Sequence, residues 1–325
     1  AVSFYELCGL DQHPEDPDPF NIFNHPSWQP LLELTRERTD CIPRRWVSYT
    51  GGAPDPLAEL TKVETKIIDG SRHVTRTIRI GNRVLTERTR RDPEVDTVWT
   101  IEHLLKDEAD LKAFLSVPLP SDYGHPDTAP ILAAEAALGD AGIVMIDSGD
   151  PLCSAASMFD MGTYTMIAFA EPVLFRQLLD RFADYYWKTT ALMAAAAPGR
   201  LWRICGPEYA SPPYLPPELF REYVVNYDRP MVQAIQQHGG FARIHSHGRL
   251  RDILDDIVAT GCDALDPIEP PSQGDVELAY VRERYGRELV LFGNLEVSDI
   301  ENLPTPQFAD KVRRALDEGT RGPGR

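Results

Sequence analysis

Between residues 106 and 318 the chain alternates short apolar segments with longer segments of helical periodicity, and this alternation limits the possible fold more than any other feature. Apolar runs of five or six residues are typical of strands buried on both faces, and the helical segments between them are typical crossovers of a parallel sheet. So many units in 325 residues favour one closed barrel over an open sheet. We therefore predict an α/β fold: a (β/α)8 TIM barrel forming a single domain over residues 1–325.

The expected elements follow from this pattern. Helices are predicted over residues 172–197, 217–238 and 249–260, from Asp275 onward, and in a last segment with Thr305 as its N-cap and Gly319 just past its end. No apolar segment follows that last helix, so we expect the final strand of the barrel to be missing here. Seven barrel strands are expected, at residues 45–49, 97–102, 142–147, 200–205, 241–246, 263–267 and 288–293.

The first hundred residues have a different character. Five prolines fall within residues 11–30, which favours an extended N-terminal arm over residues 1–40. Residues 62–102 contain short β-branched segments separated mostly by Gly-Ser or Gly-Asn turns. This composition predicts a β-meander inserted before the main run of strands and helices.

Charge and cysteine content narrow the functional classes. A formal net charge of −17 argues against nucleic acid as a partner, because phosphate binding requires a basic surface. The five cysteines form no C-x-x-C pair, which predicts no disulfide framework and a reducing, cytoplasmic environment. The N-terminus does not resemble a signal peptide, and no apolar run reaches about 18 residues, so no association with a membrane is expected.

Active sites of TIM barrels are built at the carboxyl ends of the strands, and this chain places acids, imidazoles and tyrosines there. We predict catalytic roles for Asp147, Asp150 and Glu208, although Asp147 and Asp150 are equally suited to capping the helix that follows. Tyr49, Tyr209 and Asn294 are predicted to bind substrate. The strand-end residues with these chemistries are Ser48, Tyr49, Asp147, Asp150, Glu208, Tyr209, His245, His247, Asp266, Glu269 and Asn294.

The His-Ser-His run at 245–247 is the most specific feature. Residues two apart on a strand share a face, so both imidazoles can point into the barrel mouth. Glu269 ends the next strand and can reach the same point. Two histidines and one carboxylate form a known catalytic zinc set, and they suit non-haem iron equally well. The alternatives are substrate-binding or acid/base histidines, and purely structural ones.

Three longer segments resemble the uroporphyrinogen decarboxylase superfamily, which includes the corrinoid-dependent methyltransferases. A weaker match is IDSGDPLCSA, and the main segments are GPEYASPPYLPPELFREYV, GGFARIHSHGRLRDILDDIVATGCDALDPIEPPSQGDV and RYGRELVLFGNLEV. The resemblance implies a TIM barrel, a homodimer and a site in the barrel mouth. The decarboxylases hold tetrapyrrole carboxylates with arginines in a loop after the first strand. Here that region reads PRRWVSYTGGAPD, with no arginine closely after the strand, so the methyltransferase members are the closer likeness.

Those methyltransferases bind zinc through an H-x-C motif and a distant cysteine. His245 matches the histidine of the motif, His247 stands where its cysteine would be, and Glu269 resembles a carboxylate that joins the zinc in related members. No cysteine follows Cys262. The resemblance therefore implies a divalent metal, zinc first, at His245, His247 and Glu269, and a corrinoid (cobalamin) carried by a partner protein.

Three functions follow as hypotheses. The first is a methyltransferase or demethylase component that uses this metal site on a small molecule together with the corrinoid protein. The second is a cofactor-free lyase that decarboxylates a tetrapyrrole or other carboxylated substrate, with Asp147, Asp150 or Glu208 as its acid or base. The third is a non-catalytic protein that binds a small ligand or docks a corrinoid carrier.

Overall fold

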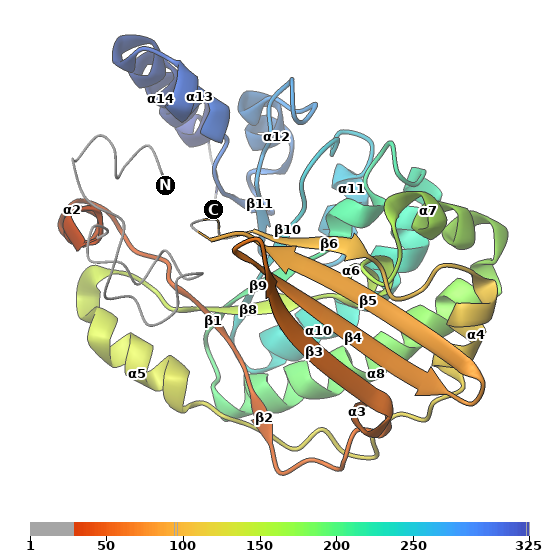
Figure 1. Cartoon of the computed structure of the whole chain (residues 1–325). Coiled ribbons are helices and arrows are strands. Elements are labelled where there is room, and N and C mark those ends of the chain that lie inside the picture. The colour runs from red at the N-terminus through yellow and green to blue at the C-terminus, as the bar shows by residue number, and fades with distance from the viewer. Residues whose placement is uncertain (1–28, 94, 96, 323, 325) are drawn as a thin grey trace.

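The computed structural model describes residues 29–93, 95, 97–322 and 324. Its centre is a parallel sheet whose strands follow one another in the order β1-β8-β9-β10-β11-β12 (Figure 1). Every neighbouring pair in this sheet is parallel. The six strands are β1 (Arg44–Trp46), β8 (Met145–Gly149), β9 (Leu201–Cys205), β10 (Phe241–His245), β11 (Ala264–Asp266) and β12 (Val290–Leu291).

Helices cross over between these strands, as the alternating pattern predicts. The long helix α8 contacts both α6 and α10, and α10 contacts β10. The helices are α2 (Gln29–Arg38), α3 (Pro56–Leu60), α4 (Glu108–Leu115), α5 (Ala129–Leu138), α6 (Pro151–Ala156), α7 (Met161–Ala170), α8 (Pro172–Ala196), α9 (Pro217–Phe220), α10 (Asn226–Gln237), α11 (Leu254–Ala259), α12 (Leu278–Tyr285), α13 (Val297–Asn302) and α14 (Thr305–Thr320). A π-helical turn, Arg221–Val225, joins α9 to α10.

The core lies between the sheet and these helices. Ile204 and Ile244 face it from β9 and β10 and are fully buried. Phe175 and Leu178 of α8 and Met231 of α10 pack in the same cluster. Alternation along the strands therefore places Arg203, Arg243 and His245 on the opposite face of the sheet.

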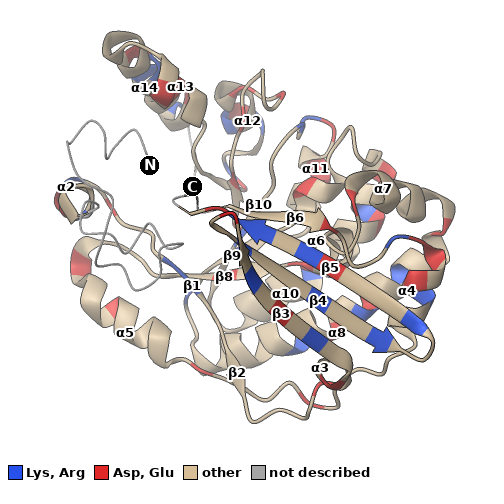
Figure 2. Cartoon of the chain, viewed as in Figure 1, with Lys and Arg blue, Asp and Glu red and all other residues tan. Residues whose placement is uncertain are grey.

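A four-stranded antiparallel sheet precedes these crossovers and confirms the predicted meander. Its strands are β3 (Thr61–Ile68), β4 (Ser71–Ile80), β5 (Arg83–Arg91) and β6 (Val98–Glu102). Ile78 and Leu85 pair across β4 and β5 and are buried in the core, and Ile80 packs against it. In Figure 2, bands of lysine and arginine cross β3, β4 and β5.

The predicted TIM-barrel fold class is confirmed, but the expected number of strands is wrong. Residues 97–102 were expected in the barrel, yet β6 pairs antiparallel with β5, and β1 pairs directly with β8. The described residues therefore contribute six strands to the parallel sheet, not seven. The strand expected at 45–49 is also divided, because β2 (Tyr49–Thr50) leaves the sheet to pair with β7 (His125–Pro126).

Several element boundaries differ from the predictions. The helix expected over 249–260 begins only at Leu254, because the carboxylate of Asp275 accepts the backbone N–H groups of Leu250 and Arg251. Asp275 thus caps a turn instead of starting a helix, and α12 begins at Leu278. In α14, Thr305 is the first helical residue, Pro304 is the N-cap, and Gly319 lies inside the helix.

The arm predicted over residues 1–40 lies mainly outside the described residues, and its described part forms α2 instead of an extended segment. Among the helices that the structure describes, none combines the length and apolar character needed to cross a membrane.

Candidate active site

Five charged or titratable side chains lie on the face of the sheet turned away from the core, and we call them the polar face: Asp147, Arg203, Arg243, His245 and Asp266. The strand register sets them side by side. Asp147 of β8 is the Cα partner of Arg203 of β9, which in turn partners Arg243 of β10. Two residues further along, His245 partners Asp266 of β11. Because neighbouring strands lie about 4.8 Å apart, these side chains form one connected group.

The carboxylate of Asp147 is paired with two arginines, Arg203 and Arg44. Its carboxylate accepts two hydrogen bonds from Arg203, Nε–H to Oδ1 at 2.7 Å and Nη2–H to Oδ2 at 3.1 Å. Arg44 of β1 approaches Oδ2 at 3.4 Å. With its side chain buried and both oxygens engaged, Asp147 is suited to positioning Arg203 and not to exchanging protons with a ligand.

Arg243 is buried and only partly neutralised. Its Nη2 lies 3.1 Å from Oδ2 of Asp266, and its guanidinium stacks 4.6 Å from the ring centroid of Phe292. Its Nε–H has no hydrogen-bond partner. Burial lowers the pKa of Arg243, the charge of Asp266 opposes that change, and the charge of Arg203 adds to it.

His245 and His247 are each oriented by a carboxylate. Nδ1 of His245 lies 2.6 Å from Oδ2 of Asp266, and Nδ1 of His247 lies 2.6 Å from Oε1 of Glu269. An ionised carboxylate only accepts hydrogen bonds, so each Nδ1 carries the proton and each Nε2 is left for a ligand. The two rings meet edge to face with their centroids 4.7 Å apart.

The same contacts set the charge of Asp266. Burial raises the pKa of this carboxyl, but the hydrogen bond from His245 and the charge of Arg243 outweigh it, so the pKa is lowered overall. Asp266 is therefore a carboxylate at neutral pH. An ionised aspartate beside a histidine fixes the tautomer and the orientation of the imidazole ring.

The predicted metal ligands are close together, but Glu269 does not stand beside the histidines as a third ligand. Its Oε1 holds Nδ1 of His247, and its Oε2 accepts the backbone N–H of Gly248 at 2.7 Å. Within the part of the chain that the structure describes, no three His, Cys, Asp or Glu side chains gather in a metal-binding arrangement. Metal binding therefore stays a prediction that rests on the two Nε2 atoms, and no chemical step is derived through a metal.

A second group of acids consists of Asp150 and Glu208, which follow β8 and β9, and Asp228 of α10. Asp150 and Asp228 are fully buried, and Glu208 is their neighbour. Asp150 caps α6, where its Oδ1 accepts the backbone N–H of Cys153 at 2.5 Å, but its Oδ2 has no partner. Neither carboxyl oxygen of Asp228 has a partner.

Burial raises the pKa of Asp150 well above its ordinary value, and the charge of Asp228 adds to this effect. Burial also raises the pKa of Asp228, with Glu208 as the further cause. Burial therefore favours the protonated form of both groups in the folded protein. Asp150 can both cap the helix and act as an acid, because Oδ1 accepts the capping hydrogen bond and Oδ2 has no partner.

The three residues predicted to bind substrate are separated. Tyr49 donates its hydroxyl to the carbonyl of Thr189 at 2.9 Å and lines a cavity of about 90 Å³ that Asp147 also lines. Tyr209 lies by the buried acids, and burial raises its pKa to about 12. Asn294 instead lines a groove of about 460 Å³ between β12, α12 and α14.

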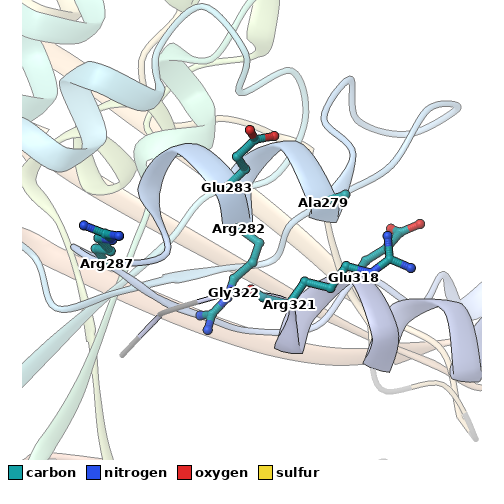
Figure 3. Close-up of a pocket in the computed structure, with 7 residues that line it drawn as sticks. All are labelled: Ala279, Arg282, Glu283, Arg287, Glu318, Arg321 and Gly322. Carbon is teal, nitrogen blue, oxygen red and sulfur yellow. Dashed lines mark hydrogen bonds between the residues drawn. The ribbon is translucent and has the colours of Figure 1, made fainter.

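A cavity of about 500 Å³ lies between α12 and the end of α14. Figure 3 shows its lining, in which the charged residues are Arg282, Glu283, Arg287, Glu318 and Arg321. None of the predicted site residues lines it. The side chains suited to chemistry are thus on the polar face and among the buried acids, away from this cavity.

Arg203, Arg243 and Asp228 were not anticipated from the sequence. Both arginines interrupt apolar strands, LWRIC and FARIH, and Arg243 has the same phase as His245. Asp228 lies four residues after Val224 and three before Met231, on the apolar face of its helix. Charged residues at these buried phases were a detectable signal, since they are rarely buried without a function or a partner.

A profile of the uroporphyrinogen decarboxylase (URO-D) family matches residues 125–325. Among solved structures, a methyltransferase from Methanosarcina mazei superimposes with a TM-score of 0.59 at 14% sequence identity, over 98% of this chain and 82% of that chain. No curated protein sequence matches the chain. The structural likeness concerns the fold, whereas the profile covers more than half of the chain and includes the polar face, the histidine pair and the buried acids. The chain therefore belongs to the uroporphyrinogen decarboxylase family of enzymes.

Proposed function

We propose that this protein is a methyltransferase or demethylase component that acts on a small molecule together with a corrinoid-carrying partner protein. The observation that carries the proposal is the histidine pair, in which each imidazole is fixed at Nδ1 by a carboxylate and presents Nε2 at the end of β10. The resemblance of this run to the methyltransferase H-x-C motif supports the proposal. The solved structure named as a methyltransferase supports it as well.

In this reaction the side chains of this protein would accept and donate a proton. The corrinoid, bound to the partner, supplies or accepts the methyl group. When an acceptor with an O–H, N–H or S–H group is methylated, the acceptor atom would form a bond to the methyl carbon and lose its proton, while the bond from the methyl group to the corrinoid would break and leave its electron pair on the corrinoid. Nε2 of His245 takes this proton, and the carboxylate of Asp266 stabilises the imidazolium that results. In demethylation, the same imidazolium returns the proton to the leaving atom.

The test uses free methylcobalamin as methyl donor with a series of thiol, amine and hydroxyl acceptors, and follows loss of the methyl group by visible absorbance. His245→Gln is expected to slow transfer by about 10²–10⁴-fold, the usual contribution of a general base. His238→Gln is the matched control, because His238 contacts the carbonyl of Ala234 at the end of α10, outside the site. Equal rates for His245→Gln and the unsubstituted protein would refute the proposal.

The predicted zinc is tested separately, by elemental analysis of the purified protein. Here the two Nε2 atoms would be protein ligands, and Asp266 and Glu269 would orient them. Zinc bound at these two Nε2 atoms is the alternative to proton uptake by His245, and it predicts one equivalent of zinc that is lost in both His245→Ala and His247→Ala. Metal content that is the same in these variants and in the unsubstituted protein would exclude a metal at this pair.

The buried acids favour a second candidate, a cofactor-free decarboxylase. Loss of carbon dioxide leaves a carbanion that must be protonated, and burial favours the protonated form of Asp150 and Asp228. Release of carbon dioxide from a carboxylated substrate, strongly reduced in Asp150→Asn, would support this candidate. Release that Asp150→Asn leaves unchanged would exclude these acids as the proton source.

A further inference from the structure

Two arginines stand side by side on the polar face. Arg203 and Arg243 are Cα partners on the parallel strands β9 and β10, and their side chains share one face of the sheet. Like charges directly opposite on neighbouring strands repel each other and destabilise a sheet. Negative charge nearby is needed to offset this repulsion. The neighbouring carboxylates show how much negative charge the protein itself supplies.

The acids do not fully balance the arginines. Asp147 takes both hydrogen bonds from the Arg203 fork and is also the nearest acid to Arg44. Asp266 serves Arg243 and His245 through one oxygen, Oδ2. Three guanidinium groups thus share two carboxylates, which leaves a local positive excess within a protein whose formal net charge is −17.

An unused donor marks where a further anion would bind. The Nε–H of Arg243 has no partner, although the side chain is only 9% exposed and Phe292 holds the guanidinium from one side. A buried donor without a partner costs stability unless a ligand satisfies it. The surroundings are not sealed, since the side chains of Arg203 and His245 keep 12% and 17% of their exposure.

We propose that Arg243, with Arg203 beside it, binds a carboxylate group of the substrate. A planar carboxylate fits the fork of a guanidinium, and the contact with the ring of Phe292 holds this guanidinium in place. His245 lies two residues beyond Arg243 on the same face of β10, so a ligand anchored by its carboxylate extends toward Nε2 of His245. This inference rests on the proposed function only in placing the reacting group at His245.

Calorimetric titration with acetate, succinate and inorganic phosphate, at constant ionic strength with chloride as the background anion, tests the site. The carboxylates are expected to bind in preference to phosphate. Arg243→Lys keeps the charge but loses the fork and the Nε–H, so binding should weaken by about tenfold or more. Asp147→Asn removes one negative charge beside Arg203 without changing shape, so binding should tighten by about threefold to tenfold.

Arg200→Lys is the matched control, because Arg200 makes the same forked contact with Glu135, at 3.0 Å to each oxygen, outside the polar face. It should leave carboxylate binding unchanged. Carboxylate affinity that is the same in Arg243→Lys as in Arg200→Lys would overturn the proposal, as would a preference for phosphate. If these charges had a purely structural role, Asp147→Asn would weaken carboxylate binding. That result would also overturn the proposed anion site.

The same titrations separate this inference from the proposed function. His245→Gln should retain carboxylate binding while losing methyl transfer. If carboxylates bind as described but no methyl transfer is found with any acceptor, the anion site stands and the methyltransferase proposal fails. If methyl transfer proceeds with acceptors that lack a carboxylate, and Arg243→Lys leaves KM unchanged, the anion site fails and the methyltransferase proposal stands.

Discussion

At the scale of single residues, Asp228 is the least satisfied group among those described, because both of its carboxyl oxygens are buried without a partner. Its pKa is raised in the folded protein, whereas in the unfolded chain it ionises at a pH of about 4. Above that pH, folding requires proton uptake. The contribution of Asp228 to stability therefore falls as pH rises from about 4 toward its folded pKa.

Asp228→Asn removes this pH dependence, because an amide does not titrate. We expect the melting temperature of the variant, relative to that of the unsubstituted protein, to increase between pH 5 and pH 8. Thermal unfolding at several pH values measures the difference, with Asp252→Asn at an exposed position as control. A melting-temperature difference that is constant across this range would contradict the assignment of a raised pKa.

Gly206 connects β9 to the buried acids and leaves no room for a side chain. Its φ is +142°, and a Cβ added there would lie 2.1 Å from Oδ1 of Asp150. We expect Gly206→Ala to lower the free energy of unfolding by about 2 kcal/mol or more, from backbone strain and overpacking together. Gly199→Ala is the control in urea unfolding, since Gly199 also has a positive φ but no atom near the added Cβ. An equal decrease in the free energy of unfolding for both variants would show that Asp150 moves aside without destabilising the protein.

Site residues whose placement follows from neighbouring positions in the chain could be predicted from the sequence. Those whose placement depends on tertiary partners could not. His245 and His247 were predicted to share a face because alternation along a strand is a local rule. Glu269 holds Nδ1 of His247 because of the geometry of the loop after β11. No spacing in the sequence encodes that geometry. Arg243 was overlooked for the same reason, because its neighbours lie on other strands.

At the scale of elements, the meander is attached to the core through β4 and β5. Ile78 and Leu85 are paired and buried, whereas Val63 on β3 is exposed. We expect Leu85→Ala to lower the free energy of unfolding by about 2–5 kcal/mol, since it leaves a cavity in the core. Val63→Ala should change it by no more than about 0.5 kcal/mol. Urea unfolding compares them, and similar losses for both variants would mean that this attachment is unimportant.

Elements with a strong local pattern were predicted well, and those defined by their neighbours were not. The helix at α8 and the strands β9 and β10 follow from apolar periodicity and length alone. The segment that forms β6 also reads as a strand, but a pattern within one strand does not say which strand it pairs with. The late start of α11 has a similar cause, because it depends on the distant carboxylate of Asp275.

At the scale of the whole molecule, the formal net charge of −17 opposes the approach of an anion to the positive polar face. Added salt screens the long-range repulsion between them. We expect the association rate constant for a carboxylate ligand to rise as ionic strength increases from about 10 to about 100 mM, the reverse of electrostatic steering. Stopped-flow measurements provide the rate constant, and a decrease over this range would show that the local arginines dominate even at long distance.

The overall architecture could be predicted because the alternation of strands and helices spans most of the chain, and the family profile covers the same region. The number of barrel strands could not, since it depended on where one segment pairs. The charge balance on the polar face also required the structure, because its members are contributed by β8, β9, β10 and β11, and Arg44 approaches them from β1.

The contact between β1 and β8 has a consequence for the order of folding. The Arg44–Asp147 pair joins residues 103 apart in the chain, and the whole meander lies within that loop. Closing so long a loop is entropically unfavourable, whereas the hairpins of the meander form between adjacent segments. We therefore expect amide protons of β4 and β5 to become protected early in pulse-labelled refolding, and those of β1 last. On this view β1 is the strand that completes the sheet, and Arg44 reaches Asp147 only when it docks.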